Sequence, residues 1–160
     1  MLILAAGGGS AALLVGALAF QYLGGLPPCA MCYWQRYPHI AAVAVAALAL
    51  ILQRVLLALL GAVAAATTAA IGLYHVGVEQ RWWEGPNTCT SGSTAGLSPE
   101  ELLAQILEAP VVRCDDIAWS LAGISMAGWN AIASAGLAAI WLAAVWLMTS
   151  AKQPSTPHAA

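Results

Sequence analysis

Charged side chains are scarce in this sequence, and their scarcity excludes a soluble globular protein. Charged residues make up 8% of the 160 residues and hydrophobic residues 61%. A soluble domain carries roughly 25% charged residues, because such groups cover its water-facing surface. All but three of the charged residues lie between Glu79 and Asp116. The composition therefore predicts an integral membrane protein.

The sequence also lacks any run of lysine or arginine, and its net charge is −2. Nucleic-acid binding depends on basic side chains that neutralise phosphates, so this class of function is excluded. The apolar excess excludes an intrinsically disordered chain, which cannot bury enough apolar surface to fold. Membrane lipid is therefore the expected surrounding, and no nucleic-acid partner is expected.

Four apolar stretches are long enough to cross a bilayer as helices. A span needs about 20 residues, and strands of a membrane barrel would alternate in polarity over about 10 residues. These runs are continuously apolar, so we predict an all-α bundle and a single domain over 1–150. The four transmembrane helices are expected at about 2–23, 33–52, 55–78 and 118–148. The last stretch is overlong, so part of it must tilt or leave the bilayer.

The two ends of the chain carry few signals. The first stretch lacks the basic residues that open a secretory signal peptide and is long for one, so we expect a retained helix. Residues 151–160 are expected to form a disordered cytoplasmic tail.

Lysine and arginine counts do not decide the orientation of the protein in the membrane. All four cysteines fall in the connections at about 24–36 and 79–117. Disulfides persist outside the cytosol, so these two loops are expected there and both termini in the cytoplasm.

The longer loop contains the signature of a short amphipathic helix. Ser98 and Glu101 match a capping box, and Pro99 occupies the first helical position. The apolar positions 102, 103, 106 and 107 then form one stripe. We predict a helix over 99–108, which lies either on the membrane surface or against the bundle.

The four cysteines are Cys29, Cys32, Cys89 and Cys114, and they allow three pairings. Proximity favours the local pairing, Cys29–Cys32 and Cys89–Cys114. A Cys-x-x-Cys disulfide closes too small a loop to be a useful staple. A zinc ribbon requires two Cys-x-x-Cys motifs. The second pair of cysteines here is far apart in the sequence, so no metal is expected. The pattern favours redox chemistry over inert disulfides.

Arg36 lies four residues after Cys32, so on a helix the two share a face. A guanidinium and a helix N-terminus would both favour the thiolate of Cys32. The alternative is that Arg36 snorkels to the lipid headgroups. Pro38 suits only the first turn of a helix, and a helix that began at Tyr37 would leave Cys32 in a loop. The neighbouring aromatic residues fit an interfacial belt or the wall of a flat cofactor site.

At these residues the chain resembles the bacterial disulfide bond formation protein B (DsbB) family. The matching features are Pro28-Cys29-Ala30-Met31-Cys32, Arg36, Cys89, Cys114, Trp119 and the stretch 125–129. The resemblance implies an inner-membrane oxidoreductase, with both cysteine loops in the periplasm. It would reoxidise a thioredoxin-fold dithiol protein (DsbA) and pass the electrons to ubiquinone or menaquinone. The broad label of chaperone also follows from the resemblance.

The resemblance also implies a role for each cysteine. Cys89 would be attacked by the thiolate of the partner, which releases Cys114. Cys114 would then attack Cys29 and free Cys32, whose thiolate would face the quinone. Arg36 would stabilise both that thiolate and the reduced quinone oxygen.

His75, at the outer end of the third helix, is a second candidate for the quinone site, because the family has a histidine in a comparable place. Its alternative is an interfacial histidine bonded to Glu79 or to a backbone carbonyl. Other interpretations remain open. A haem bundle would use His39 and His75 as axial ligands. A protein similar to vitamin K epoxide reductase would share the bundle and the quinone, with its cysteine pairs in another order.

Overall fold

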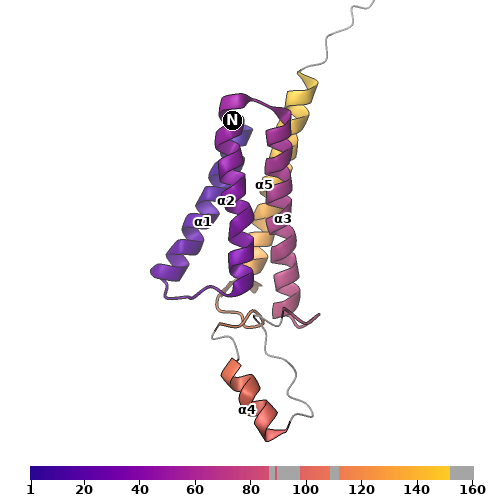
Figure 1. Ribbon diagram of the computed structural model, residues 1–160. Helices are drawn as coiled ribbons and strands as arrows, with labels where there is room; N and C mark the ends of the chain where they lie inside the picture. Colours follow the sequence, from indigo (N-terminus) through magenta and orange to yellow (C-terminus); the bar gives the residue numbers. More distant parts are fainter. Residues whose placement is uncertain (87–88, 90–97, 109–111, 152–160) are drawn as a thin grey trace, which may run out of the picture.

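The computed structural model describes residues 1–86, 89, 98–108 and 112–151. Four long helices lie side by side (Figure 1): α1 Leu2–Tyr22, α2 Ala30–Leu52, α3 Val55–Glu79 and α5 Met126–Ser150. Each is long and apolar enough to cross a membrane. The predicted all-α bundle of four transmembrane helices is confirmed.

The bundle has two distinct ends (Figure 1). The N-terminus, the end of α5 and the tight connection between α2 and α3 lie at one end. Gln53 makes that connection possible with a left-handed backbone, φ 47°. The connections from α1 to α2 and from α3 to α5 lie at the opposite end, so all four cysteines belong to this second end.

Small side chains let the helices approach closely at the end that holds the termini. The buried cluster there consists of Ala6, Ala46, Ala58, Ala62, Ala65 and Trp141. A Cβ at Gly61 would lie 2.5 Å from the Trp141 ring, so only glycine lets that ring lie against α3. Close backbone approach replaces the hydrophobic effect as the source of helix association in lipid.

Helix α2 begins at Ala30, earlier than the predicted start at residue 33. Pro28 disfavours a helical conformation for the residue before it, so the helix cannot extend further toward the N-terminus. Cys29 is the N-cap, and its Sγ accepts a hydrogen bond from the backbone N–H of Cys32 at 3.3 Å. Pro38 lies inside the helix, which costs the Trp34 carbonyl its helical donor. A start at Tyr37 is therefore wrong, and Cys32 and Arg36 are helical.

The predicted fourth span, 118–148, is partly wrong, because its first residues are not helical. Strands β1 Ser120–Leu121 and β2 Ile124–Ser125 form an antiparallel hairpin. Its two turn residues, Ala122 and Gly123, both have positive φ, as two-residue hairpin turns require. Ser125 then caps α5, and its Oγ accepts from the N–H of Gly128 at 3.1 Å. The overlong stretch thus divides into a hairpin and a helix.

Helix α4, Pro99–Glu108, lies away from the four long helices (Figure 1). The capping box is formed: the N–H of Ser98 donates to Glu101 at 2.8 Å, and the N–H of Glu101 donates to Ser98 Oγ at 3.3 Å. The first bond lowers the pKa of Glu101. Leu103 and Leu107 are exposed, so the alternative in which α4 packs against the bundle is not what the structure shows. The predicted tail beyond Ala151 lies outside the described residues.

Candidate redox site

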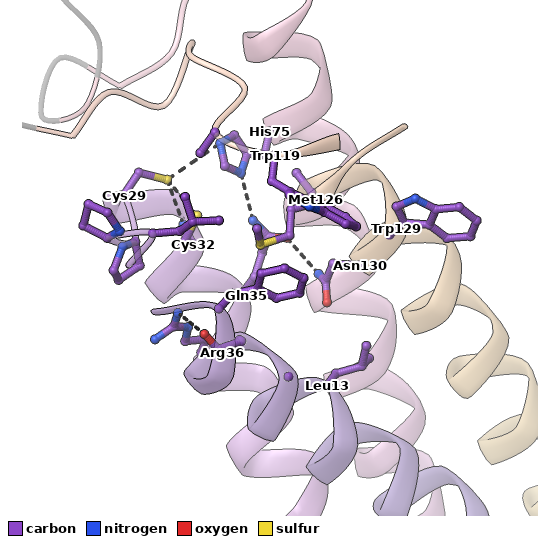
Figure 2. A pocket seen from close by; sticks show the side chains of 18 of the residues that line it. Leu13, Cys29, Cys32, Gln35, Arg36, His75, Trp119, Met126, Trp129 and Asn130 are labelled. Carbon is purple, nitrogen blue, oxygen red and sulfur yellow. Dashed lines mark hydrogen bonds between the residues drawn. The ribbon is translucent and has the colours of Figure 1, made fainter. Parts of the chain in front are cut away.

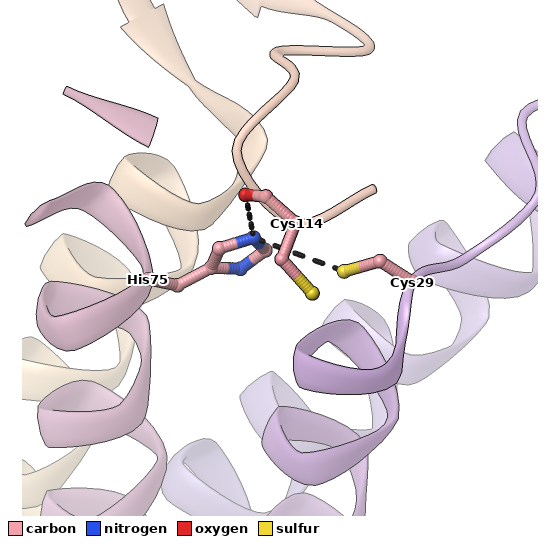
Figure 3. A group of neighbouring side chains, drawn as sticks. All are labelled: Cys29, His75 and Cys114. Carbon is pink, nitrogen blue, oxygen red and sulfur yellow. Dashed lines mark hydrogen bonds between the residues drawn. The ribbon is translucent and has the colours of Figure 1, made fainter. Parts of the chain in front are cut away.

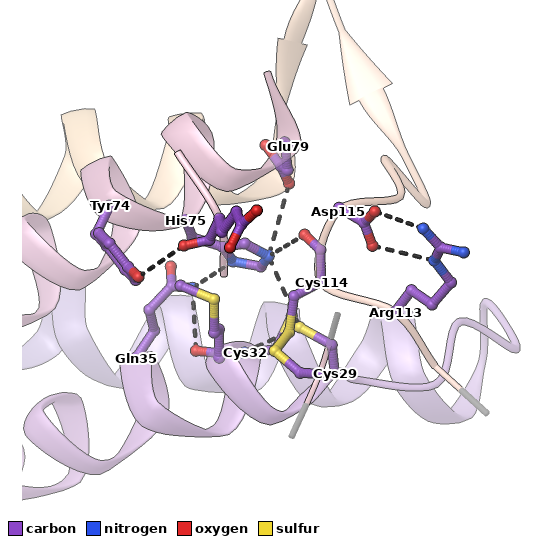
Figure 4. The surroundings of a disulfide bond; sticks show 12 residues. Cys29, Cys32, Gln35, Tyr74, His75, Glu79, Arg113, Cys114 and Asp115 are labelled. Atoms are coloured by element: carbon purple, nitrogen blue, oxygen red, sulfur yellow. Dashed lines mark hydrogen bonds and ion pairs between the residues drawn. A yellow bond between two sulfur atoms is a disulfide. The ribbon is translucent and has the colours of Figure 1, made fainter. Parts of the chain in front are cut away.

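Cys89 and Cys114 form a disulfide, as the sequence predicts, and both are fully buried. The backbone also joins them, because the N–H of Cys114 donates to the Cys89 carbonyl at 2.7 Å. An ion pair between Arg113 and Asp115 flanks Cys114 (Figure 4). The hydrogen bond from Arg113 lowers the pKa of Asp115. The backbone around Cys114 is therefore held by contacts that do not involve the sulfur atom.

Cys29 and Cys32 are free thiols, so the expected second disulfide is not formed in this structure. Their sulfur atoms lie 3.0 Å apart, with Cys29 as the donor. That hydrogen bond, together with burial, raises the pKa of Cys29 well above its ordinary value. Cys32 Sγ accepts that hydrogen, and it lies in the first turn of α2, where the positive end of the helix dipole favours a negative sulfur. The pair thus separates into a protonated thiol, Cys29, and a sulfur suited to carry charge, Cys32.

The two cysteine pairs are in contact (Figure 3). Cys29 Sγ, a ring nitrogen of His75 and Cys114 Sγ all lie within 4.8 Å of one another. His75 Nε2 is 3.7 Å from Cys29 Sγ and 3.1 Å from the Cys114 carbonyl oxygen. Electrons pass between two pairs only by attack of one sulfur on another. The geometry allows such exchange between Cys29 and Cys114 without a large movement.

A chain of hydrogen bonds fixes the orientation of His75 (Figure 2). Gln35 Nε2 is 2.9 Å from His75 Nδ1 and also donates to the Met31 carbonyl. Nδ1 therefore accepts, and Nε2 carries the hydrogen that is donated to Cys114. Gln35 Oε1 in turn accepts from Asn130 at 2.8 Å. The alternative of a histidine bonded to a backbone carbonyl is thus observed, with Glu79 Oε1 at 4.0 Å from Nε2.

The same chain continues across the bundle to a second histidine. Asn130 Oδ1 accepts from His39 Nε2 at 3.0 Å, and Asn130 Nδ2 also donates to Thr68 at 3.2 Å. Asn130 thus joins α5 to both α2 and α3. Gln35 was not predicted as a site residue. A single amide in an apolar helix gives no sequence signal for partners that lie 40 and 95 residues away.

A cavity of about 320 Å³ opens beside the thiols. Its polar lining includes Cys32, Arg36 and His39, and its apolar lining includes Phe20, Trp119 and Trp129. Two buried polar atoms among the described residues lack a hydrogen-bond partner and belong to lining residues, His39 Nδ1 and Glu79 Oε2. Ligand sites of this size combine apolar walls with a few polar groups. The chemistry of the lining fits a flat, apolar ring that carries oxygen atoms.

Arg36 is hydrogen-bonded to helix α1. Its guanidinium donates to Gln21 Oε1 at 2.6 Å and to the Ala17 carbonyl at 3.3 Å, and it lies 5.2 Å from the centre of the Tyr33 ring. Arginine has five N–H donors, so donors remain for the cavity. No distance or contact among the described residues favours the haem alternative, in which His39 and His75 would be axial ligands.

Two cysteine pairs in contact at one end of a four-helix bundle define a membrane protein with redox-active cysteines. The family model "Disulfide bond formation protein DsbB" matches residues 1–144. The chain belongs to this family, and it is a disulfide bond formation protein of the membrane. The alternative similar to vitamin K epoxide reductase is therefore set aside.

Individual relatives agree with the family. The chain is 29% identical over 138 residues to disulfide bond formation protein B of Shewanella sp. strain ANA-3, which covers 81% of this chain and 77% of the relative. The proteins of the same name from strains MR-4 and MR-7 are 28% identical over the same coverage. No solved structure matches. These matches support disulfide bond formation and do not support the label of chaperone.

Proposed function

We propose that this protein oxidises the dithiol of a soluble thioredoxin-fold protein of the DsbA type and delivers the electrons to a membrane quinone, ubiquinone or menaquinone. One observation carries the proposal: Cys29 Sγ and Cys114 Sγ lie within 4.8 Å of each other. This contact supports transfer from a loop disulfide to a pair beside a membrane cavity.

The order in which the cysteines act is the one that membership of the DsbB family suggests. A thiolate of the partner attacks Cys89, forms a mixed disulfide and releases Cys114 as a thiolate. The second thiolate of the partner then attacks its own sulfur in the mixed disulfide and releases Cys89, so the partner leaves oxidised. Cys114 attacks Cys29 of an oxidised Cys29–Cys32 pair and releases Cys32. Attack by Cys89 on Cys114 restores the loop disulfide and leaves both electrons on Cys29 and Cys32. Each step exchanges one sulfur–sulfur bond for another.

The cavity residues define what would hold the quinone. A quinone supplies an acceptor for two electrons that is more oxidising than the partner protein. Phe20, Trp119 and Trp129 would pack against its ring. Arg36 and His39 would orient its oxygens, with Arg36 donating from N–H groups not used by α1. The raised pKa of Cys29 keeps its hydrogen in place, so that Cys32 is the sulfur that carries negative charge.

The proposed setting is the bacterial inner membrane, with both termini in the cytoplasm and both cysteine loops in the periplasm. Disulfides persist in that compartment, and the end of the bundle that carries all four cysteines would face it. Labelling of single engineered cysteines at Ser98 and Ala151 with a membrane-impermeant thiol reagent checks this orientation. The proposal requires labelling at Ser98 only.

The deciding experiment measures oxidation of a reduced DsbA-type protein by the purified chain, with and without added quinone. Each cysteine is replaced by serine in turn. We expect quinone-dependent oxidation by the wild type and none by Cys29→Ser or Cys32→Ser. Cys89→Ser and Cys114→Ser should each abolish the oxidation, because either change removes the loop disulfide that the partner attacks. Wild-type protein that leaves the partner reduced in the presence of quinone would refute the proposal.

A further inference from the structure

The contact between the two cysteine pairs has a chemical property beyond sulfur exchange. Cys29 Sγ, His75 and Cys114 Sγ place two sulfurs and one imidazole nitrogen within 4.8 Å of one another, and all three residues are buried (Figure 3). Thiolate and imidazole are the ligands that zinc prefers. In the structure Cys114 is bonded to Cys89, so its sulfur becomes a ligand only after that disulfide is reduced.

Glu79 offers a fourth ligand to this group. Its Oε1 lies 4.0 Å from His75 Nε2, and its side chain is only 5% exposed. Its other oxygen, Oε2, is buried and has no hydrogen-bond partner among the described residues. A buried carboxylate with an unused oxygen is costly unless a charge or a donor compensates it. A bound divalent cation would supply that compensation.

Two separations in this group are close to those of a tetrahedral site. Zinc binds sulfur at about 2.3 Å and nitrogen or oxygen at about 2.0–2.2 Å, so tetrahedral neighbours lie roughly 3.3–3.8 Å apart. Cys29 Sγ and His75 Nε2 are 3.7 Å apart. Cys114 Sγ lies within 4.8 Å of Cys29 Sγ and of a ring nitrogen of His75, and His75 Nε2 is 4.0 Å from Glu79 Oε1. Cys32 and Glu79 both lie outside the group within 4.8 Å, so Glu79 would turn its side chain to reach the ion.

We propose that the fully reduced protein binds Zn²⁺ or a similar thiophilic divalent cation through Cys29, Cys114, His75 and Glu79. A dithiol first reduces Cys89–Cys114, with one disulfide formed for the one broken. The cation then displaces one proton from each of the two thiols. This site differs from the Cys₄ ribbon that the sequence argues against, and it revises the expectation that the chain binds no metal.

The surrounding residues can support the metal-bound state. A metal on His75 Nε2 requires the hydrogen on Nδ1, and Gln35 would then turn its amide so that Oε1 accepts it. Metal-bound histidines usually donate their second N–H to such an oxygen. Cys114 would stay in place because its N–H is bonded to the Cys89 carbonyl. A bound cation would join the two pairs and stop exchange between them, which makes the site inhibitory.

The test uses the full chain in detergent, reduced and desalted under argon, with Zn²⁺ alone as the probe. Competition against a chromophoric chelator gives the affinity, and Co²⁺ substitution reports the number of thiolate ligands by charge-transfer absorption. We expect one tightly bound ion per reduced chain, two thiolate ligands and no tight binding to the oxidised chain. Zn²⁺ should protect Cys29 and Cys114 from alkylation and leave Cys32 and Cys89 reactive.

Matched variants separate this site from adventitious binding by thiols. Cys89→Ser and Cys114→Ser each leave three thiols, but only Cys114→Ser should weaken zinc binding, by about 100-fold. Cys29→Ser should weaken binding similarly, whereas Cys32→Ser should change it by less than about threefold. Glu79→Gln should weaken it by about tenfold, within the range for groups that support a metal.

Equal affinities for Cys89→Ser and Cys114→Ser would overturn the proposal, as would a loss for Cys32→Ser that matches the loss for Cys29→Ser. Circular dichroism and gel filtration exclude variants that fail to fold. No quinone and no protein partner enter this experiment. Its outcome is therefore independent of whether the chain reduces quinone.

Discussion

The end of the bundle that holds the termini packs small apolar side chains around Trp141, whereas the cysteine end buries hydrogen-bonded polar side chains. The polar set joins three helices and consists of Gln35, His39, Thr68, His75, Asn130 and Ser134. Close packing of small residues holds helices together but tolerates some sliding. Hydrogen bonds with defined donors and acceptors fix both distance and orientation. The first end therefore supplies stability, and the second supplies the geometry that the sulfurs need.

The largest expected effect tests the apolar end. Trp141 is fully buried among alanines, so Trp141→Ala should lower the free energy of unfolding by about 3–5 kcal/mol, as for large core truncations. Thermal unfolding in detergent measures this. Exchange between the cysteine pairs should be unchanged at temperatures where the variant is folded, because no hydrogen bond of the polar set involves Trp141.

Trp141→Phe is the matched control. Trp141→Phe keeps most of the ring and removes an indole N–H that is buried and has no hydrogen-bond partner in the described part of the chain, so the loss of stability should be much smaller. A Trp141→Ala variant that is folded but slow in sulfur exchange would contradict the division between the two ends.

The next effect tests the polar end. Gln35→Met removes the amide that joins His75 to Asn130 while keeping the length of the side chain. His75 loses its Nδ1 partner, and its ring should rotate away from Cys29 and Cys114. We expect exchange between the pairs to slow by about 10- to 100-fold, because small misplacements are costly in reactions of this kind. Stopped-flow alkylation of Cys32 after addition of a reduced partner measures it.

Gln53→Met provides the control at the opposite end of the same helix. Gln53 is exposed and has a left-handed backbone that is equally strained for both residues. It should leave the exchange rate unchanged. Slowing of equal size in both variants would show that α2 transmits a general loss of stability rather than a local loss of geometry.

Sequence reasoning predicted much of this structure, because its signals were local. Long uncharged runs predicted the four spans, and Ser98 with Glu101 predicted the start of the helix at 99. The Cys89–Cys114 pairing followed from proximity. The start of α2 was missed because Pro38 disfavours a helix interior, and tertiary packing outweighed that preference. The hairpin at 120–125 was missed because its residues are as apolar as a span.

The polar set shows why the remainder was not predictable. The sequence singles out His75, but nothing in its segment or in that of Asn130 indicates that Gln35 lies between them. Their contact depends on the rotation of three helices, which the positions of small residues determine. The sequence pattern predicts which helices form, but it says much less about how each helix is rotated about its own axis.

A smaller effect is expected at two adjacent residues of α3, Thr67 and Thr68. Thr68 is buried and donates from α3 to the Gln35 carbonyl on α2 at 3.0 Å, whereas Thr67 is more exposed and donates to Val63 on its own helix at 2.8 Å. Thr68→Val should lower the free energy of unfolding by about 1–2 kcal/mol, because it also leaves Asn130 short of an acceptor. Thr67→Val should change it by less than about 0.5 kcal/mol. If the two variants lost equal free energy of unfolding, the hydrogen bonds of the polar set would contribute no more to stability than a bond within one helix.

The smallest effect lies outside the bundle, at the ion pair beside Cys114. Arg113 lowers the pKa of Asp115 in the folded protein, so the folded state holds this proton less readily than the unfolded chain does. The stabilisation is complete above the unfolded pKa, about 3.9, and is lost as the pH falls toward the folded value. For a pair at the surface it amounts to about 0.5 kcal/mol.

The reduction rate of Cys89–Cys114 by a small phosphine, which stays reactive in acid, should rise between pH 5 and pH 3 in the wild type. Asp115→Asn should already show the faster rate at pH 6 and lose that part of the dependence on pH. Identical profiles for the two proteins would mean that the disulfide, the bond from Cys114 to Cys89 and the bond to His75 hold the segment without help from the charges.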